Sequence, residues 1–263
     1  MTPGDAAIRS ETDGAICWLT IDNPPRLNAL TRDMWASIPP LVAAADRNEE
    51  IRVVVVTGAG TRAFSAGADI SEFGANRTGA AAREYDAINH AAYVALAGCS
   101  KPTIAMVRGY CFGGACELAI CCDFRIAATD AVFSVPAAKL SLGYNPRWIR
   151  PMLSVMSAAR VKEMLYTGRR YRAEEAHAMG LANAVVAPER LRSEVERLAG
   201  EIADNAPLSI RAAKAAVDEL TLHPEDPDLA RLDGLVDACF ASEDFREGQR
   251  AFLEKRKPRF RGR

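Results

Sequence analysis

The stretch Gly109-Tyr-Cys-Phe-Gly-Gly-Ala-Cys-Glu-Leu-Ala119 is the most informative part of this sequence. It follows an apolar run, Thr103–Val107, that predicts a strand, and its two adjacent glycines predict the start of a helix. Gly113 and Gly114 let the backbone approach a ligand and leave N–H groups unpaired at the positive end of the helix dipole. Glu117 follows in an otherwise apolar turn. An amide donor beside an isolated acid suits chemistry at a carbon next to a carbonyl.

Length and composition indicate an ordinary globular protein. The chain has 263 residues, of which 33 are basic and 34 acidic, so no overall charge attracts nucleic acid or an anionic membrane. One or two domains are expected at this length. Apolar runs such as Val53–Val56 are too short to span a bilayer. Met1–Ser10 lacks the pattern of a signal peptide, so we expect a cytoplasmic protein.

The cysteines and histidines predict neither a disulfide framework nor a metal site. Seven cysteines occur without a CxxC spacing, and most lie in apolar segments, which is typical of reduced, buried thiols. The three histidines, His90, His177 and His223, are scattered and match no metal-binding pattern.

The first two thirds of the chain alternate apolar strands with amphipathic helices. A continuous β-branched run over residues 51–57 is typical of a strand buried on both faces. A helix is expected over residues 28–45, with Pro39-Pro40 breaking or bending it. Further strands are expected over residues 15–21, 103–107, 124–128, 132–135 and 182–186, and further helices over residues 83–97 and 113–122.

From about Pro188 the pattern becomes helical throughout. Leu191, Val195, Leu198 and Ile202 fall on one helix face, and a second apolar stripe follows further along. We therefore expect an α/β core over residues 1–205 and a C-terminal helical oligomerisation region over residues 206–263.

A second loop has the same character as the first, and with it a family resemblance emerges. Small residues in Phe64-Ser-Ala-Gly-Ala-Asp-Ile70 follow a predicted strand. This segment and Gly109–Ala119 closely resemble the crotonase, or enoyl-CoA hydratase/isomerase, superfamily. Asn23–Leu30 and Ala251–Lys257 extend the resemblance over essentially the whole chain, with the four motifs in the family's order.

The resemblance implies a fold and an activity. The family's fold is a spiral of ββα turns, followed by a helical region that builds trimers, often paired into hexamers. Its members act on acyl-CoA thioesters, many of them in fatty acid metabolism as lyases or isomerases. Coenzyme A would therefore be part of the substrate, and no permanently bound cofactor is implied.

Site residues follow from the resemblance at matching positions. The amides of Ala68 and Gly114 would form an oxyanion hole for the thioester oxygen, and Glu117 would act as acid or base at the neighbouring carbon. Tyr144 matches a tyrosine that lies near the acyl group in some relatives. The residues expected along coenzyme A are Arg26, Ala66, Ala68, Asp69, Ile70, Phe252 and Lys255, the last two commonly at a subunit boundary.

One position departs from the hydratase pattern. Enoyl-CoA hydratases of the family have a second glutamate in a Pro-Glu pair, and the matching segment here is Pro136-Ala137. Hydration uses both members of the glutamate pair, one to deprotonate water and the other to deliver a proton. A methyl group does neither, so the standard two-glutamate route is not expected to run efficiently.

Three functions stay open at this point. Hydratase/isomerase chemistry is the leading interpretation. The segment Leu142-Gly-Tyr-Asn145 resembles methylmalonyl-CoA decarboxylases, which favours a decarboxylase of malonyl-type CoA esters as the alternative. Ala137 and the basic C-terminal tail would also fit an idle acyl-CoA-binding or RNA-binding relative, but Glu117 argues against an idle site because burying a carboxylate is costly.

Overall fold

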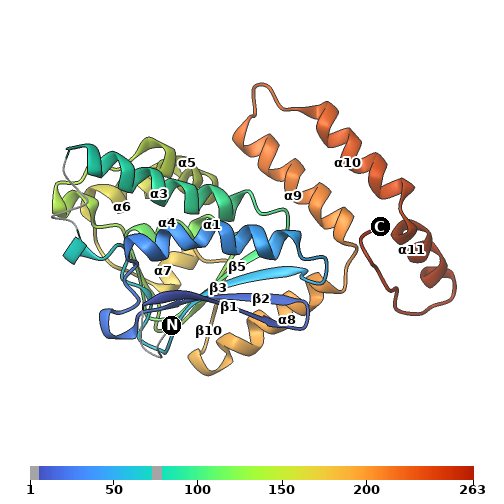
Figure 1. Cartoon of the computed structure of the whole chain (residues 1–263), viewed down its shortest axis with the longest axis horizontal. Helices are drawn as coiled ribbons and strands as arrows, with labels where there is room; N and C mark the ends of the chain where they lie inside the picture. The colour runs from blue at the N-terminus through green and yellow to red at the C-terminus, as the bar shows by residue number, and fades with distance from the viewer. Residues whose placement is uncertain (1–5, 73–78) are drawn as a thin grey trace.

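The computed structural model describes residues 6–72 and 79–263, and two β-sheets lie at its centre (Figure 1). In order across the larger sheet, the strands are β1 (Ala7–Asp13), β2 (Ile16–Asp22), β3 (Val53–Gly58), β5 (Thr103–Val107), β7 (Phe124–Ala128) and β10 (Ala184–Val186). Across the smaller sheet they are β4 (Ala63–Ser65), β6 (Tyr110–Phe112), β8 (Val132–Ser134) and β9 (Tyr171–Arg172).

The chain winds through these sheets as a spiral. From β2 to β10 the larger sheet is parallel, and so is the smaller sheet from β4 to β8, while β1 and β9 pair antiparallel with their neighbours. Each of β3, β5 and β7 is followed by a strand of the smaller sheet and then by a helix. This repeat confirms the spiral of ββα turns that the resemblance implied.

Helices cover both faces of the larger sheet. The helices of the described residues, in chain order, are α1 (Arg32–Arg47), α3 (Gly79–Ala97), α4 (Gly114–Ile120), α5 (Pro146–Val155), α6 (Ala158–Thr167), α7 (Ala173–Ala178), α8 (Leu191–Ala203), α9 (Pro207–Leu222), α10 (Leu229–Ala241) and α11 (Glu243–Leu253). Helices α1, α3 and α4 lie on one face and α8 lies on the other. Short 3-10 turns are η1 (Pro24–Arg26), η2 (Ile70–Glu72), η3 (Ala137–Leu140) and η4 (Pro188–Arg190).

Strand β3 is buried on both faces, as its β-branched run predicted. Val54 and Val56 belong to the large core on one side of the sheet, which also contains residues of α1, α3 and α4. Val53 and Val55 pack into a second core on the other side, under α8. Alternate side chains of a strand point to opposite faces, so one run of valines supplies both cores.

Helix α1 differs from the prediction in where it begins and in continuing without a break past its two prolines. It begins at Arg32 rather than residue 28, because Asn28 has a left-handed backbone (φ 57°) and Thr31 caps the amide of Met34. It also continues through Pro39-Pro40. The buried face of this helix offsets the loss, because each buried large apolar side chain stabilises by about 1.5–3 kcal/mol, against about 3 kcal/mol lost at an interior proline.

Several short elements were not predicted. Strands β1, β4, β6 and β9 and helices α5 to α7 have no counterpart in the predicted series, and α4 is shorter than residues 113–122. Strands of two or three residues, such as β9 and β6, carry too little sequence pattern to stand out. Their pairing depends on neighbours that are distant in the sequence.

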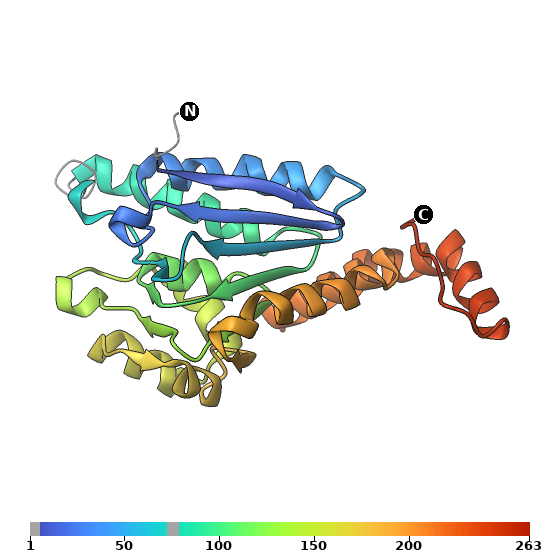
Figure 2. The same ribbon diagram turned by 90° about the horizontal axis from the view of Figure 1, so that it is seen from below.

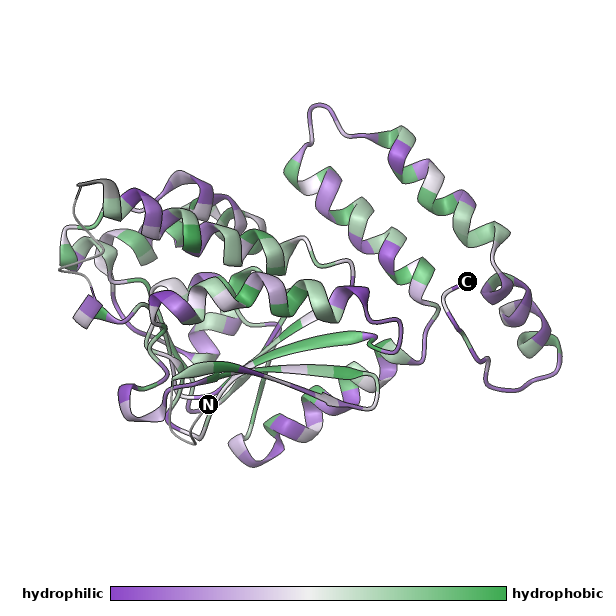
Figure 3. Ribbon diagram, in the orientation of Figure 1, coloured by the Kyte–Doolittle hydropathy of each residue, from purple (hydrophilic) through white to green (hydrophobic). Residues whose placement is uncertain are grey.

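The last three helices, α9 to α11, form an arm that extends from the body of the molecule (Figures 1 and 2). Lys214 of α9 attaches the arm to the body, its Nζ lying 2.9 Å from the carboxylate of Asp123. Apolar residues recur along α9 and α10 (Figure 3), and Val236 and Phe240 are exposed. A groove of about 610 Å³ lies between the three helices.

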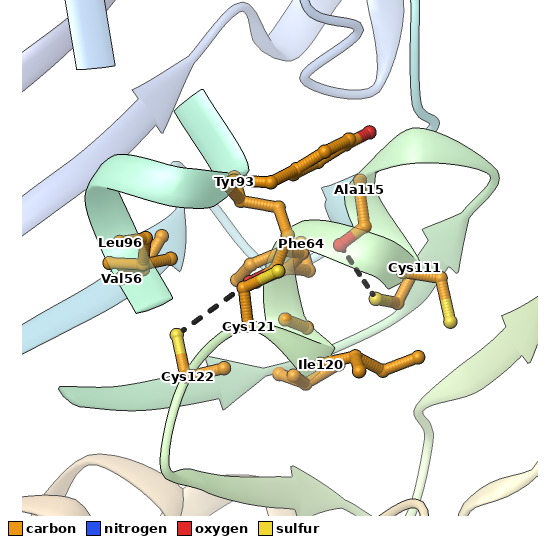
Figure 4. Packing of buried hydrophobic residues seen from close by; sticks show 14 of the residues in the cluster. Val56, Phe64, Tyr93, Leu96, Cys111, Ala115, Ile120, Cys121 and Cys122 are labelled. Carbon is orange, nitrogen blue, oxygen red and sulfur yellow. Dashed lines mark hydrogen bonds between the residues drawn. The ribbon is translucent and has the colours of Figure 1, made fainter. Parts of the chain in front are cut away.

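All seven cysteines are free in the structure, and six of them are buried, as the apolar segments around them predicted, whereas Cys239 is partly exposed. Figure 4 shows Cys111, Cys121 and Cys122 packed among apolar side chains, and the Cys111 thiol lies 3.7 Å from the carbonyl oxygen of Ala115. Within residues 6–72 and 79–263, no helix has the length and apolarity needed to cross a membrane. The same residues contain no group of three or more His, Cys, Asp or Glu side chains placed to hold a metal ion.

Candidate active site

The Gly113-Gly114 turn connects β6 to α4 and leaves one amide free. Gly113 adopts φ 54° and ψ −126°, a conformation that a side chain would strain, and its amide donates to the carbonyl of Ser134 at 2.8 Å. The amides of Cys116 and Glu117 then bond to the Gly113 carbonyl. The amide of Gly114 donates to no group in the part of the chain that the structure describes. It is therefore available to a ligand.

The loop after β4 presents a second free amide. Its neighbours are fixed, since the Gly67 carbonyl accepts from the Leu30 amide at 2.8 Å and the Asp69 amide donates to the Leu30 carbonyl at 2.9 Å. Between them, the amide of Ala68 has no acceptor among the described residues. The loop thus holds this N–H in place without using it.

The two free amides belong to segments in direct contact. A methyl group placed on Gly67 would lie 2.6 Å from the carbonyl oxygen of Phe112 and 3.5 Å from the amide nitrogen of Gly114. Only glycine allows this approach, and φ at Gly67 is +94°. The structure therefore brings the loops of Ala68 and Gly114 into contact.

The buried side chain of Asn28 supports the loop that contains Ala68. The Asn28 side chain donates to the carbonyls of Ala59 and Ala63 at 2.9 and 2.8 Å, and its oxygen accepts from the Asn23 amide at 3.0 Å. The Ala66 amide donates to the carbonyl of Leu27 at 2.9 Å. The conformation of Asn23–Leu30 is thus tied to that of the loop, which explains why these segments occur together in the sequence pattern.

Glu117 is fully buried one turn into α4. Its Oε2 accepts a hydrogen bond from the Tyr144 hydroxyl at 3.2 Å, whereas its Oε1 has no partner among the described residues. Burial raises the pKa of Glu117 to about 8, and the Tyr144 hydrogen bond lowers it only in part. The carboxyl group is therefore mostly protonated at neutral pH, with one oxygen free.

Tyr144 lies in the loop before α5, with its ring against Trp148 at a centroid distance of 5.6 Å. Burial and the neighbouring Glu117 carboxyl raise the pKa of the Tyr144 hydroxyl well above its ordinary value. The hydroxyl therefore remains a proton donor in its hydrogen bond to Glu117.

Ala137 is buried at the start of η3. It stands shortly after Ser134, whose carbonyl accepts from Gly113, so the chain passes the start of α4 just before it reaches Ala137. Among the described residues, no second carboxyl group contributes to the pKa of Glu117. The pKa of Glu117 is therefore set by burial and by the Tyr144 hydroxyl.

Arg26 and Asp69 form an ion pair at the edge of the Ala68 loop. Nη1 of Arg26 lies 2.9 and 2.7 Å from the two carboxylate oxygens of Asp69. Burial alone would raise the pKa of Asp69, but hydrogen bonds from Ser71 and the pairing with Arg26 outweigh it and lower that pKa. The adjacent Ile70 is 63% exposed. Half of the Arg26 side chain also stays accessible.

Phe252 and Lys255, also predicted to bind coenzyme A, lie far from the other predicted site residues of the same chain. Phe252 is 84% exposed at the end of α11, and Lys255 follows it with a left-handed backbone (φ 53°). Helix α11 lies at the far end of the arm from α4 (Figures 1 and 2).

Three aromatic residues near the site were missed by sequence reasoning. Trp35, Tyr93 and Trp148 come from α1, α3 and α5 and are all buried. The Tyr93 hydroxyl donates to the carbonyl of Gly114 at 3.1 Å. Their positions on helix faces are the same as those of ordinary core aromatics, so the sequence carried no signal that set them apart.

Comparisons with known proteins identify the family of this chain. The family model described as enoyl-CoA hydratase/isomerase matches residues 11–263. A crotonyl-CoA hydratase from Syntrophomonas wolfei is 37% identical, over 95% of this chain and 96% of its own length. A carnitinyl-CoA dehydratase from Salmonella arizonae is 34% identical, over 97% of this chain and 98% of its own length.

A solved structure extends the likeness to the fold. An enoyl-CoA hydratase/carnithine racemase from Magnetospirillum magneticum superposes with a TM-score of 0.92 at 35% identity, covering 97% of this chain and 96% of that one. Together with the matched family model and the sequence relatives, this places the chain in the enoyl-CoA hydratase/isomerase family.

Proposed function

We propose that this protein binds the carbonyl of an acyl-CoA thioester between the amides of Ala68 and Gly114 and uses Glu117 as its acid or base. The observation that carries the proposal is the buried Glu117 carboxyl, which has one oxygen unbonded among the described residues and lies one turn after the free Gly114 amide. Donors aimed at a developing oxyanion are each worth about 3–4 kcal/mol in comparable sites.

The leading reaction is hydration or double-bond isomerisation of a short enoyl-CoA. Relatives include a crotonyl-CoA hydratase and a carnitinyl-CoA dehydratase, whose names describe addition or removal of water on CoA esters. Proton transfer next to the thioester places negative charge on the carbonyl oxygen, where the two amides would stabilise it. A Glu117 pKa of about 8 suits both halves of the cycle, since the carboxyl can give up and regain a proton near neutral pH.

Ala137 favours a second reaction, decarboxylation of a malonyl-type CoA ester. The departing carboxylate supplies the electron pair that forms the enolate, so the amides are needed but a second acid is not. Afterwards the α carbon of the enolate would take up a proton, from Glu117 or from water. The lack of a carboxyl neighbour among the described residues supports this route.

Coenzyme A would be bound partly by a neighbouring subunit. Arg26, Ala66, Ala68, Asp69 and Ile70 would bind coenzyme A from the same chain, which the Arg26–Asp69 ion pair beside the Ala68 loop supports. Phe252 and Lys255 are exposed on the arm and would reach the coenzyme A of another chain. The exposed apolar face of α9 and α10 would pack between chains in a homotrimer, or in a hexamer of two trimers. This would bring the arm of one chain to the CoA of the next. Because the cysteines are free thiols, we place the enzyme in the cytoplasm.

A substrate panel tests the proposal. Crotonyl-CoA, a 3-enoyl-CoA and methylmalonyl-CoA are each incubated with the enzyme, and absorbance and product mass are followed. Water addition, a double-bond shift or loss of carbon dioxide identifies the reaction. Turnover of none of the three, together with no binding of their CoA esters, would refute the proposed site.

The variant Ala137→Glu helps to distinguish hydration from decarboxylation. If the site keeps hydratase geometry, the second carboxyl should raise crotonyl-CoA hydration, since each such group contributes typically about 10²–10⁴-fold. Wild-type hydration as fast as that of two-glutamate enzymes would instead show that Ala137 is not the decisive position. Sedimentation of the wild-type protein tests the assembly, and a monomer at micromolar concentration would contradict the shared CoA site.

A further inference from the structure

A series of aromatic rings connects the two halves of the proposed site. Trp35 contacts Tyr93 at a centroid distance of 5.5 Å, Tyr93 contacts Trp148 at 5.8 Å, and Trp148 contacts Tyr144 at 5.6 Å. All three pairs meet nearly at right angles, with interplanar angles of 78°, 79° and 79°. Edge-to-face pairs of this kind are favourable and directional, so the series has a defined geometry.

Each of the two tyrosines in the series donates a hydrogen bond to a group of the proposed site. The Tyr144 hydroxyl donates to the Glu117 carboxyl at 3.2 Å. The Tyr93 hydroxyl donates to the carbonyl of Gly114 at 3.1 Å. Figure 4 shows the Tyr93 ring extending from α3 across the start of α4, near Ala115. Trp148 lies between these tyrosines and contacts both.

Gly114 is also held by close contact with two of the rings. A methyl group at this position would lie 2.8 Å from the Tyr93 hydroxyl oxygen and 3.2 Å from Cζ2 of Trp35. The rings therefore occupy the space where other residues have a side chain. The Gly114 N–H shares its peptide group with the Gly113 carbonyl, which accepts from the amides of Cys116 and Glu117. The next peptide group, which carries the Gly114 carbonyl, is the one that Tyr93 holds, and glycine has the widest backbone freedom between two such groups.

We propose that Tyr93 is a positioning residue, which holds the peptide group that carries the Gly114 carbonyl and so limits rotation about the Gly114 backbone, which keeps the free Gly114 amide pointed at the thioester carbonyl. This inference rests on the proposed function. The hydrogen bond to the Gly114 carbonyl restrains rotation of that residue, while the packed ring blocks its movement towards α3. A donor displaced by about 1 Å can cost about 10²-fold in rate, so a restraint on its direction acts on catalysis rather than on substrate affinity.

The test compares Tyr93→Phe with Tyr166→Phe, a matched control on α6 whose side chain is 72% exposed. The ring of Tyr93 stays in place and only its hydroxyl is lost. We expect kcat to fall about tenfold, with KM within twofold of wild type, because the hydroxyl restrains a group that acts in the transition state. The control should match wild type in both constants.

An infrared measurement separates positioning from a merely structural role. The carbonyl stretch of bound crotonyl-CoA, labelled with ¹³C at the thioester carbon, reports how strongly the amides polarise the bond. We expect a smaller downward shift in Tyr93→Phe than in wild type, and an unchanged shift in Tyr144→Phe, because the Tyr144 hydroxyl bonds to Glu117 and not to Gly114. Thermal unfolding of each variant shows whether a loss of activity follows a loss of fold.

Two results would overturn the inference. A Tyr93→Phe enzyme with wild-type kcat and wild-type carbonyl shift would show that the hydroxyl has no positioning role, although the proposed function would stand. A fall in kcat that tracks a lower unfolding temperature, with the carbonyl shift unchanged, would make Tyr93 structural only. If the wild-type protein itself neither binds crotonyl-CoA nor shifts its carbonyl band, the proposed function fails first and this inference with it.

Discussion

The body and the arm of this molecule hold their proposed site residues in opposite ways. In the body, Glu117 is fully buried, and the Ala68 and Gly114 loops are fixed by backbone hydrogen bonds and by close contact with each other. On the arm, Phe252 is 84% exposed, and its helix projects away from α4 (Figure 2). One chain therefore contains the whole proposed acyl site but only part of the proposed CoA site.

This difference assigns separate tasks to the two regions. Groups that act on the reacting atoms need a fixed direction, which burial in a packed core provides. Groups that bind the distant end of a long ligand contribute affinity, and they can be supplied by another chain. Changes to Glu117 and to the Ala68 and Gly114 loops should therefore alter kcat, and changes in the arm should alter KM.

The largest effect is expected for Glu117→Gln. The amide keeps the size of the side chain but cannot transfer a proton, so hydration or isomerisation should fall by about 10²–10⁴-fold. Binding of a non-reacting CoA ester, measured by calorimetry, should remain close to wild type because the two amides are intact. Decarboxylation that survives this substitution with modest loss would identify the alternative reaction.

Gly114→Ala should have the next largest effect. The new methyl group would clash with the Tyr93 hydroxyl oxygen and with Trp35, so the backbone must move. The Gly114 amide would then no longer point at the thioester oxygen. We expect kcat/KM to fall by about 10²–10³-fold, the usual cost of losing one oxyanion donor. The arm offers a control in Gly234→Ala on α10, where a methyl group meets nothing within 4 Å. Equal losses of kcat/KM in Gly114→Ala and Gly234→Ala would contradict the separate tasks assigned to the body and the arm.

The pH dependence of stability should also differ between the regions. The unfolded chain releases the Glu117 proton near its ordinary pKa of 4.5, whereas the folded protein keeps it up to about pH 8. The unfolded state then binds fewer protons, so stability falls as pH rises through this range. Between pH 5 and 7.5 the loss from this group should be roughly 3 kcal/mol.

Urea unfolding of wild type and Glu117→Gln at both pH values measures this loss. The Gln variant should show a smaller decrease, since it carries no proton to release. Asp237→Asn on exposed α10 is the control and should stay within about 0.5 kcal/mol of wild type. Parallel pH curves for wild type and Glu117→Gln would mean that burial does not hold the proton on Glu117.

The smallest effect is expected on the arm. If Phe252 and Lys255 reach the CoA of a neighbouring chain, the double variant Phe252→Ala/Lys255→Ala should raise KM about five- to tenfold and leave kcat within twofold. Leu253, which is 81% exposed beside Phe252, gives the matched control Leu253→Ala. A change in kcat rather than KM would indicate that the arm takes part in the chemistry.

Sequence patterns predicted the parts of this fold that depend on local information. The valine run of β3 and the run of β5 identified central strands, because strands buried on both faces are continuously apolar. Gly114 and Glu117 were found through a spacing that fits a helix start. By contrast, the two-residue strand β9 exists only through its pairing with β8.

In the candidate site, too, only residues that lie within one sequence motif could be predicted. Residues within one motif, such as Ala68 and Asp69, were identified by that motif. Tyr93 and Trp148 lie on helices far away in the sequence, and their contact with the site depends on how α3 and α5 pack. Pro39-Pro40 shows the converse, since a strong local signal was overridden by the burial of the α1 face.

The parallel order of the strands has a consequence for how the site comes into being as the chain folds. Ala68 follows β4, Gly114 follows β6 and Ala137 follows β8, so three successive turns of the spiral each supply one part. Parallel strands pair only after long loops have closed, and such non-local pairing is slow. The proposed site residues should therefore converge late in folding, after much of the helical structure has formed. In refolding experiments, recovery of activity should lag behind recovery of helical circular dichroism.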